Sequence, residues 1–182
     1  MSKAFVFLPE GFEETEAVTT IDLLRRGGVK VRTVSLTSSL WVTGSHQVKI
    51  EADVLFEEAE ADDNADMLVL PGGPGTENYK SHDKLLAMIK RYDSQRKVLA
   101  AICAAPTVLG LLGLLRGRAA VCYPGLEGAL GCATLSDQPV VVDGHIVTAK
   151  GPGASMAFGF QLVAVLMGDD TAENVKSAFL SS

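Results

Sequence analysis

Cysteine and histidine are scarce in this chain, with three of each among 182 residues. Cys103, Cys122 and Cys132 form no Cys-x-x-Cys pair, and the histidines lack metal-ligand spacing, so the sequence predicts neither a disulfide framework nor a metal site. We expect His82 and His145 at the surface. Free thiols in a chain long enough for a substantial core indicate a reducing compartment, and we expect a cytoplasmic protein that needs no cofactor.

Basic charge and long apolar runs are lacking as well. The chain has 16 Lys and Arg against 22 Asp and Glu, and this net charge of -6 argues against a nucleic-acid-binding surface. Residues 98–115 carry no charge and are long enough to raise the question of a membrane helix. Pro106, Gly110 and Gly113 interrupt them, which favours a buried strand followed by a buried helix. The apolar residues 4–8 are too few for a signal peptide.

Strand-like and helix-like segments alternate along the rest of the chain. The predicted strands are residues 4–8, 29–36, 66–70, 98–102, 139–142 and 145–149, and residues 41–50 predict a weak hairpin. The predicted helices are residues 13–26, 84–92, 156–167 and 171–180, with one more from Pro106. This order predicts one α/β domain over residues 1–182, with a mostly parallel sheet covered on both faces. Ligands bind beyond the carboxyl ends of such strands, which selects the loops 9–16, 71–75 and 103–106.

Cys103 stands where a predicted strand turns into a helix. Small residues surround it, and Pro106 suits the first turn of a helix. The free N–H groups of that helix start favour a thiolate, which is the nucleophilic and oxidisable form of cysteine. A small buried hydrophobic residue is an equally weighted interpretation of the same pattern. Cys122 and Cys132 are expected to be structural or incidental.

Glu16 and the pair Gly72–Gly73 are the other candidates at the same sheet edge. A carboxyl group close to a thiolate would be protonated and would donate a hydrogen bond to sulfur. The pattern alone favours a simpler role for Glu16, as an acid at a helix N-terminus. Two glycines after a buried strand let backbone amides approach a ligand, although many loops contain such a pair.

Four motifs together resemble the ThiJ/PfpI superfamily, in its DJ-one/YajL-like branch, which includes the parkinsonism-associated protein deglycase family. The motifs, in order and register along nearly the whole chain, are EETEA at 13–17, LPGG at 70–73, AAICAAP at 100–106 and KGPGA at 150–154. The resemblance implies a flavodoxin-like three-layer sandwich with a nucleophile elbow. It also implies a homodimer.

The resemblance assigns roles to individual residues. Cys103 would be the nucleophile, Glu16 its protonated partner, and the backbone amides of Gly73 and Ala104 the oxyanion site. Further residues are expected as possible pocket residues: Gly72, His46, Tyr123, Lys150, Gly151 and Pro152. No metal and no membrane contact are implied.

The function implied by the resemblance concerns oxidative and carbonyl stress. One hypothesis is a glutathione-independent glyoxalase or deglycase, in which Cys103 attacks small reactive aldehydes such as methylglyoxal and glyoxal, or glycated groups. The alternative is a redox sensor or chaperone that acts through a Cys103 sulfinate. A third is a small-molecule-binding domain without turnover.

Three positions depart from patterns in the wider superfamily. Ala104 stands where the PfpI-type proteases have a histidine after the nucleophile, which argues against peptidase or amidotransferase chemistry. Tyr123 replaces a histidine of some close relatives, so a step assisted by histidine is not expected. His46 matches an arginine that lines the pocket in some relatives.

Overall fold

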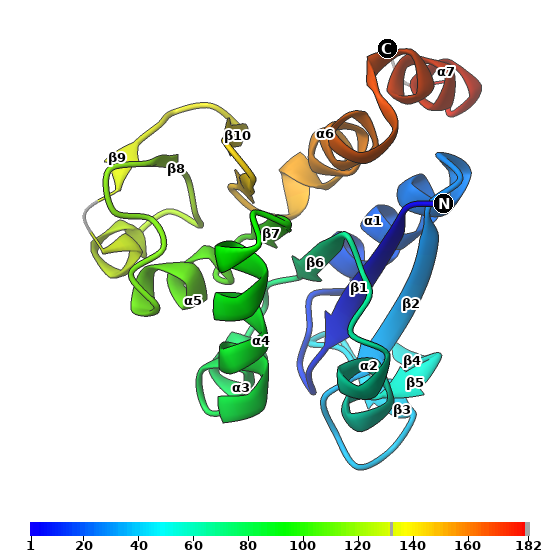
Figure 1. Cartoon of the computed structure of the whole chain (residues 1–182), viewed down its shortest axis with the longest axis vertical. Coiled ribbons are helices and arrows are strands. Elements are labelled where there is room, and N and C mark those ends of the chain that lie inside the picture. The colour runs from blue at the N-terminus through cyan, green and yellow to red at the C-terminus, as the bar shows by residue number, and fades with distance from the viewer. Residues whose placement is uncertain (132, 181–182) are drawn as a thin grey trace.

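The computed structural model describes residues 1–131 and 133–180 and has a central sheet with helices on both faces (Figure 1). Seven strands lie in the order β10-β11-β7-β6-β1-β2-β5. β10 runs antiparallel to β11, and every other neighbouring pair is parallel. The bounds of these strands are β1 Lys3–Leu8, β2 Lys30–Ser35, β5 Val54–Leu55, β6 Met67–Leu70, β7 Val98–Ile102, β10 Val140–Asp143 and β11 Ile146–Ala149. The predicted fold class is confirmed.

Alternate side chains of the strands enter two separate cores, because neighbouring residues of a strand point to opposite faces. In β1, Phe5 and Phe7 belong to one core, while Val6 and Leu8 belong to the other. All of these side chains are fully buried. The chain therefore forms three layers, with the sheet in the middle.

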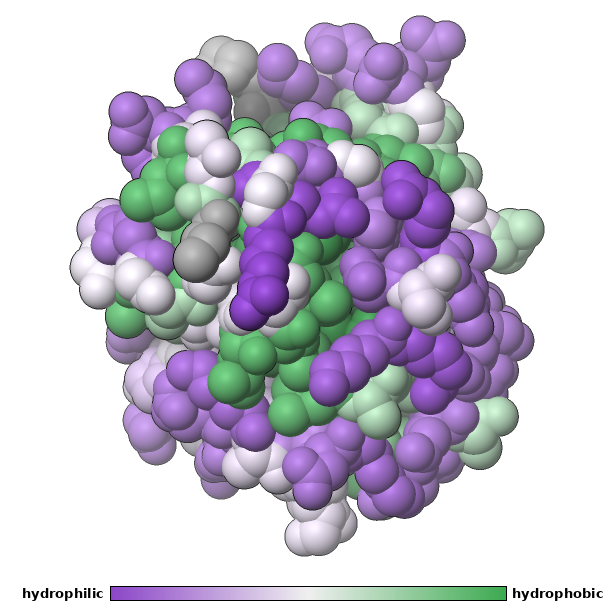
Figure 2. Space-filling model, turned by 60° about the vertical axis from the view of Figure 1, so that its left-hand side comes forward, coloured by the Kyte–Doolittle hydropathy of each residue, from purple (hydrophilic) through white to green (hydrophobic). Residues whose placement is uncertain are grey.

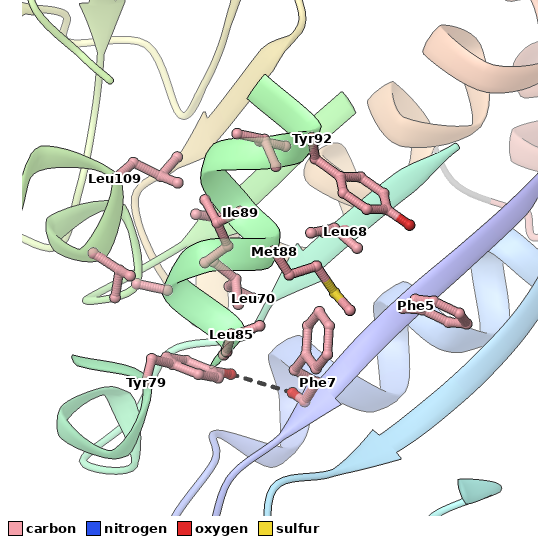
Figure 3. Packing of buried hydrophobic residues seen from close by; sticks show 14 of the residues in the cluster. Phe5, Phe7, Leu68, Leu70, Tyr79, Leu85, Met88, Ile89, Tyr92 and Leu109 are labelled. Atoms are coloured by element: carbon pink, nitrogen blue, oxygen red, sulfur yellow. Dashed lines mark hydrogen bonds between the residues drawn. The ribbon is translucent and has the colours of Figure 1, made fainter. Parts of the chain in front are cut away.

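The first core lies under α3, α4 and α5, which span Thr76–Lys80, Asp83–Ser94 and Pro106–Leu111. Leu85, Met88 and Ile89 of α4 point toward the sheet beside Phe7 (Figure 3). The hydroxyl of Tyr79 donates hydrogen bonds to Phe7 O at 3.2 Å and to Pro71 O at 2.9 Å. This buried tyrosine joins α3 to β1 and to the loop after β6, and so fixes the loop that carries the two glycines.

The second core lies under α1, α6 and α7, which span Glu14–Arg26, Ser155–Met167 and Asp169–Ala178. The helices α1 and α6 approach closely at Gly159, where an added Cβ atom would lie 2.5 Å from Cδ1 of Leu23. Glycine is needed there for space. Since α1 carries the candidate residue Glu16 in its first turn, this contact helps to fix the position of Glu16 over the sheet.

The remaining elements lie at the edges of the sheet. The predicted hairpin is present, with β3 (Trp41–Thr43) antiparallel to β4 (Lys49–Glu51). The other elements are the helix α2 (Phe56–Asp62), the short strands β8 (Ala119–Ala120) and β9 (Thr134–Leu135), and the 3-10 turns η1 (Glu127–Leu130) and η2 (Pro152–Ala154). The face that carries α5 and the β8–β9 segment has an area of hydrophobic surface bounded by hydrophilic residues (Figure 2). In the described part of the chain, no helix has the length and apolar character needed to cross a membrane.

The carboxyl ends of four adjacent strands meet at one edge of the sheet. The loops after β11, β7, β6 and β1 begin at Lys150, Cys103, Pro71 and Pro9. From β1 the chain runs outward through β2 to β5 at one edge of the sheet, and it then returns to β6 on the other side of β1. The strand order therefore reverses between β1 and β6. Ligand sites of open α/β sheets lie at such a reversal.

Candidate functional site

Cys103 has a strained backbone at the sharp turn after β7. Its φ angle is +65°, in the left-handed region that costs a residue with a side chain about 1 kcal/mol or more. Two hydrogen bonds hold this conformation: the N–H of Cys103 donates to Ala149 O at 2.9 Å, and the N–H of Tyr123 donates to Cys103 O at 2.8 Å. The turn directs the side chain away from the strand toward the loop after β6, as the predicted elbow requires.

The glycine pair lies directly against this turn. A Cβ atom on Gly72 would lie 2.6 Å from Cβ of Cys103 and 2.9 Å from Oε2 of Glu16, so no larger residue fits between them. Gly73 has a φ angle of +90°, which a residue with a side chain rarely adopts. The backbone N–H groups of Gly73 and Ala104 lie close enough to the Cys103 sulfur to lower the pKa of its thiol. The two amides expected at the oxyanion site therefore face the sulfur.

Glu16 lies in the first turn of α1 and is fully buried. Its Oε2 accepts a hydrogen bond of 2.7 Å from the N–H of Gly72, and its own N–H donates to Oε2 of Glu13, the N-cap residue, at 2.7 Å. Its Oε1 is buried and has no hydrogen-bond partner among residues 1–131 and 133–180. One carboxyl oxygen is thus held by the loop, and the other is available to carry a proton.

Burial raises the cost of ionising both acidic groups, and the Glu16 charge raises that of Cys103 further. Burial raises the pKa of Glu16 to about 7, against the lowering effect of hydrogen bonds from Gly72 and Cys103. Burial and then the Glu16 charge raise the pKa of Cys103 to about 12, opposed by the amides of Gly73 and Ala104. The two groups titrate as a pair, which holds a single negative charge from about pH 7 upward.

The sequence predicts a thiolate favoured by the helix N–H groups and a protonated Glu16 that donates to it, but the pKa of Cys103 is raised to about 12 and that of Glu16 only to about 7, which leaves the proton on sulfur. Cys103 is 7% exposed, and α5 has only six residues, so the loss of hydration exceeds the effect of the helix start on the pKa of the thiol. Ionisation of Cys103 at neutral pH requires that its proton passes to another group. Glu16, whose pKa is raised to about 7 and whose side chain interacts with Cys103, is positioned to exchange a proton with it.

A cavity of about 340 Å³ is lined in part by Gly151, which lies near the Cys103 sulfur. Its lining consists of Tyr123, Pro124, Pro139, Lys150, Gly151, Pro152, Gly153 and Ala154. A Cβ atom on Gly151 would lie 4.0 Å from the Cys103 sulfur and 3.3 Å from the Tyr123 ring, so Gly151 separates sulfur and ring. Four of the expected pocket residues, Tyr123, Lys150, Gly151 and Pro152, are brought together here. Gly72 lies instead against the Cys103 side chain, and His46 lies elsewhere.

His46 belongs to the tip of the β3–β4 hairpin, where it binds Glu14. Glu14 Oε1 accepts a hydrogen bond from the His46 N–H at 2.6 Å, and Oε2 accepts one from the Ser45 hydroxyl at 3.1 Å and lies 2.9 Å from His46 Nδ1. Burial opposes ionisation of Glu14, yet the hydrogen bonds from His46 lower its pKa to about 2. Glu14 therefore anchors the hairpin to the first turn of α1, two residues before Glu16. Sequence reasoning assigned no such role to Glu14.

We expect Glu14→Gln to destabilise the protein by about 1–2 kcal/mol near neutral pH, because charge-assisted hydrogen bonds to the hairpin are lost. Because the pKa of Glu14 is lowered from 4.5 to about 2, its contribution to stability is complete above pH 4.5 and is lost as the pH falls toward about 2. Denaturant unfolding at several pH values measures the difference. Asp22→Asn is the matched control on α1, because Asp22 forms only an exposed pair with Arg26. A loss that is equal for both variants, or independent of pH, would contradict the anchoring role.

The atoms of Glu13, Glu14 and His46 that could bind a cation lie within 4.8 Å of one another. Both oxygens of Glu14 already accept hydrogen bonds from the hairpin, and Glu13 Oε2 accepts the N–H of Glu16. We therefore interpret these three side chains as structural groups that join the hairpin to the start of α1, and not as a metal site.

The predictions for the other cysteines and for His145 can be compared with their positions in the structure. Cys122 is buried and its thiol donates to Tyr123 O at 3.4 Å, while Cys132 lies outside the described residues. The surface location expected for His145 is wrong: it is 8% exposed, and its Nε2 lies 2.8 Å from Oδ1 of Asp93. The fold buries this turn against α4, which a local hairpin pattern cannot reveal.

The family assignment follows from comparison with known proteins. The model of the DJ-1/PfpI family matches residues 2–165. The chain belongs to this family. It is 40% identical over 176 residues to Protein DJ-1 homolog B of Arabidopsis thaliana, covering 95% of this chain and 40% of the relative. A deglycase of Pyrococcus abyssi is 32% identical, with 90% of this chain and 99% of that one covered.

A solved structure of a family member gives the same fold. Oxidised Toxoplasma gondii DJ-1 is 35% identical, with a TM-score of 0.94 over 99% of this chain and 98% of that one. The resemblance inferred from the four motifs is confirmed. The chain spans less than half the length of the plant relative, so the family, and not a whole-protein activity, is what these comparisons establish.

Proposed function

We propose that this protein is a cysteine-dependent enzyme acting on small α-oxoaldehydes such as methylglyoxal and glyoxal, or on their adducts, without glutathione. The observation that carries the proposal is the Cys103–Glu16 pair, in which a buried thiol interacts with a carboxylate whose pKa is about 7. A nucleophile beside a base of matched pKa is suited to catalysis at neutral pH. The deglycase name of one relative supports the same class of substrate.

The proposed reaction begins with attack on the aldehyde carbon. As the sulfur–carbon bond forms, the Cys103 proton passes to Glu16, and the aldehyde oxygen becomes an oxyanion that the amides of Gly73 and Ala104 stabilise. Glu16 returns its proton to the oxyanion, which gives a neutral hemithioacetal, and its carboxylate then takes the proton of the aldehyde carbon. Transfer of this proton to the neighbouring carbon, and of the hydroxyl proton to the oxygen on that carbon, converts the hemithioacetal into the thioester of a hydroxy acid. The aldehyde carbon is oxidised and its neighbour reduced, so no external oxidant is needed. Water hydrolyses the thioester, releasing the hydroxy acid and restoring the thiol.

The redox-sensor hypothesis is the second candidate. The two amides at sulfur would also stabilise the oxygens of a Cys103 sulfinate, and the relative from Toxoplasma gondii is named as oxidised. A Cys103 pKa of about 12 leaves little thiolate at neutral pH for direct reaction with peroxide. Attack on an aldehyde does not need a thiolate formed in advance, because Glu16 takes the thiol proton as the sulfur–carbon bond forms. This difference makes the enzyme the favoured proposal. Ala104 after the nucleophile continues to argue against a peptidase.

The direct test is lactate formation from methylglyoxal by the purified protein in the absence of added thiols. We expect turnover at neutral pH, with no increase when glutathione is supplied. Turnover only with glutathione would contradict the mechanism. If lactate is absent while mild peroxide adds two oxygens selectively to Cys103, by mass spectrometry, the sensor role replaces the enzyme.

We further propose a homodimer and a cytoplasmic location. Three large hydrophobic side chains on α1 and around the adjoining hairpin are exposed to solvent: Val18, Trp41 and Val48. Exposed apolar groups of this size support a protein contact. The free thiols Cys103 and Cys122 support a reducing compartment.

A further inference from the structure

Tyr79 is a buried tyrosine whose hydroxyl reaches the loop that carries the two glycines. It belongs to α3 and is fully buried in the core shown in Figure 3. The hydroxyl has one proton, which is shared between Pro71 O at 2.9 Å and Phe7 O at 3.2 Å, and the shorter contact is to Pro71. A phenylalanine ring would fill the same space without burying a polar group, so packing alone does not account for the hydroxyl.

The carbonyl of Pro71 and the N–H of Gly72 belong to the same peptide group. Within residues 1–131 and 133–180, Tyr79 is the only donor to Pro71 O. On the other side of this peptide group, the N–H of Gly72 donates to Oε2 of Glu16 at 2.7 Å. A continuous path of hydrogen bonds therefore runs from the Tyr79 hydroxyl, through one peptide group, to the carboxyl group of Glu16.

This path affects the charge of Glu16. A hydrogen bond accepted by a peptide carbonyl polarises the peptide group and makes its N–H a stronger donor. The hydrogen bond from Gly72 lowers the pKa of Glu16, so a stronger donor there favours the carboxylate further. Tyr79 remains a donor throughout, because burial and then the Glu16 charge raise its pKa well above its usual value. The tyrosine hydroxyl thus opposes the effect of burial on Glu16.

The next peptide group of the loop is arranged in the same way. The N–H of Glu13 donates to Gly72 O at 3.0 Å, and the N–H of that peptide group, on Gly73, lies close enough to the Cys103 sulfur to lower the pKa of its thiol. Both peptide groups accept a hydrogen bond at the carbonyl and direct their N–H to a reacting group. The bond at Pro71 comes from a side chain and the bond at Gly72 from the backbone, so a substitution can remove the first alone.

We propose that Tyr79 is a positioning residue of the candidate site, which strengthens the hydrogen bond from the loop of residues 71–73 to Glu16. The inference deepens the proposed function and rests on the part that Glu16 plays in it. In the described residues, the titratable groups that face Glu16 are Cys103 from the turn after β7, Glu13 from the start of α1 and Tyr79 from α3. Tyr79 stays neutral beside Glu16, and its effect passes through the loop.

The first experiment measures the pKa of Glu16 without turnover, from the ¹³C chemical shift of its carboxyl carbon, assigned by its loss in Glu16→Gln. We expect Tyr79→Phe to raise this pKa by about 0.3 to 1 pH unit, because the loop becomes a weaker donor. Tyr92→Phe is the matched control: Tyr92 is a second buried tyrosine of the same core, on α4, and it makes no hydrogen bond with residues 71–73. An unchanged pKa in Tyr79→Phe, or an equal change in both variants, would overturn the proposal.

A second substitution strengthens the same donor, and it keeps the test decisive if Tyr79→Phe does not fold. Site-specific replacement of Tyr79 by 3-fluorotyrosine makes the hydroxyl more acidic and leaves the ring in place. We expect the pKa of Glu16 to fall, the opposite of the change in Tyr79→Phe. A pKa that rises or stays the same would show that the hydroxyl has only a structural role.

Lactate formation separates this inference from the proposed function. We expect Tyr79→Phe to lower kcat/KM by about two- to tenfold near pH 6, where most of Glu16 is protonated, and by much less near pH 9. A loss that is equal at both pH values would contradict the inference. Absence of lactate with the wild type, together with the expected ¹³C shifts in the two Tyr79 variants, would refute the enzyme and retain the role of Tyr79.

Discussion

Cys103→Ala and Cys103→Gly are both expected to reduce lactate formation from methylglyoxal by at least about 1,000-fold, because the attacking atom is gone. Neither substitution should disturb the sheet, since Cys103 follows β7 and its backbone hydrogen bonds to Ala149 and Tyr123 do not involve the side chain. Residual activity is measured by lactate release, with circular dichroism to verify folding. Turnover at the wild-type rate in either variant would remove Cys103 from the mechanism.

The same two variants test the strained turn. At an ordinary buried position, replacing Ala by Gly costs about 0.5–1 kcal/mol. At a φ angle of +65° glycine relieves strain, so we expect Cys103→Gly to be at least as stable as Cys103→Ala. Ala101→Gly in β7 is the control, and it should be destabilising, because Ala101 is a buried strand residue. Parallel losses at both positions would show that the elbow stores no strain.

Glu16→Gln is expected to lower kcat by about 100- to 10,000-fold, the range that a general base contributes. It should also raise the free energy of unfolding by about 1–3 kcal/mol at alkaline pH, because a buried charge is removed. A substitution that stabilises the fold and abolishes activity is the sign of a group kept for chemistry and not for folding.

The pH dependence of that stabilisation has a defined sign. The pKa of Glu16 is raised from 4.5 to about 7, so its favourable contribution is complete below pH 4.5 and is lost as pH rises through about 7. The gain in Glu16→Gln should therefore be small near pH 4.5 and largest above pH 7. Denaturant unfolding of both proteins across this range measures it. A gain that is equal at all pH values, or a loss at alkaline pH, would mean that Glu16 is not a buried acid with a raised pKa.

The sheet and most helices could be predicted because their patterns are local. The apolar strand before Pro9, the helix that ends at Gly27, and the strand that leads into Cys103 each show a clear boundary in the sequence. The short helix α3 was not predicted, since it follows the glycine loop after only a few residues and depends on the buried Tyr79 for its position. Local patterns do not describe such a long-range contact.

The residues of the candidate site could be predicted from the sequence, but their pKa values could not. Four sequence motifs placed Cys103, Glu16 and the glycine pair together, and the structure brings them into contact. The raised pKa of the thiol could not be predicted, because it depends on how deeply the sulfur is buried beside Glu16. The role of Glu14 escaped for a related reason: its partners lie 31 and 32 residues away, on the hairpin.

The pH dependence of Cys103 alkylation by iodoacetamide tests the shared proton most directly. If Glu16 accepts the proton of Cys103, reactivity should rise with a midpoint near pH 7, and this step should disappear in Glu16→Gln. A wild-type thiol that becomes reactive only as pH approaches about 12, with the same profile in Glu16→Gln, would contradict the pairing of these two groups.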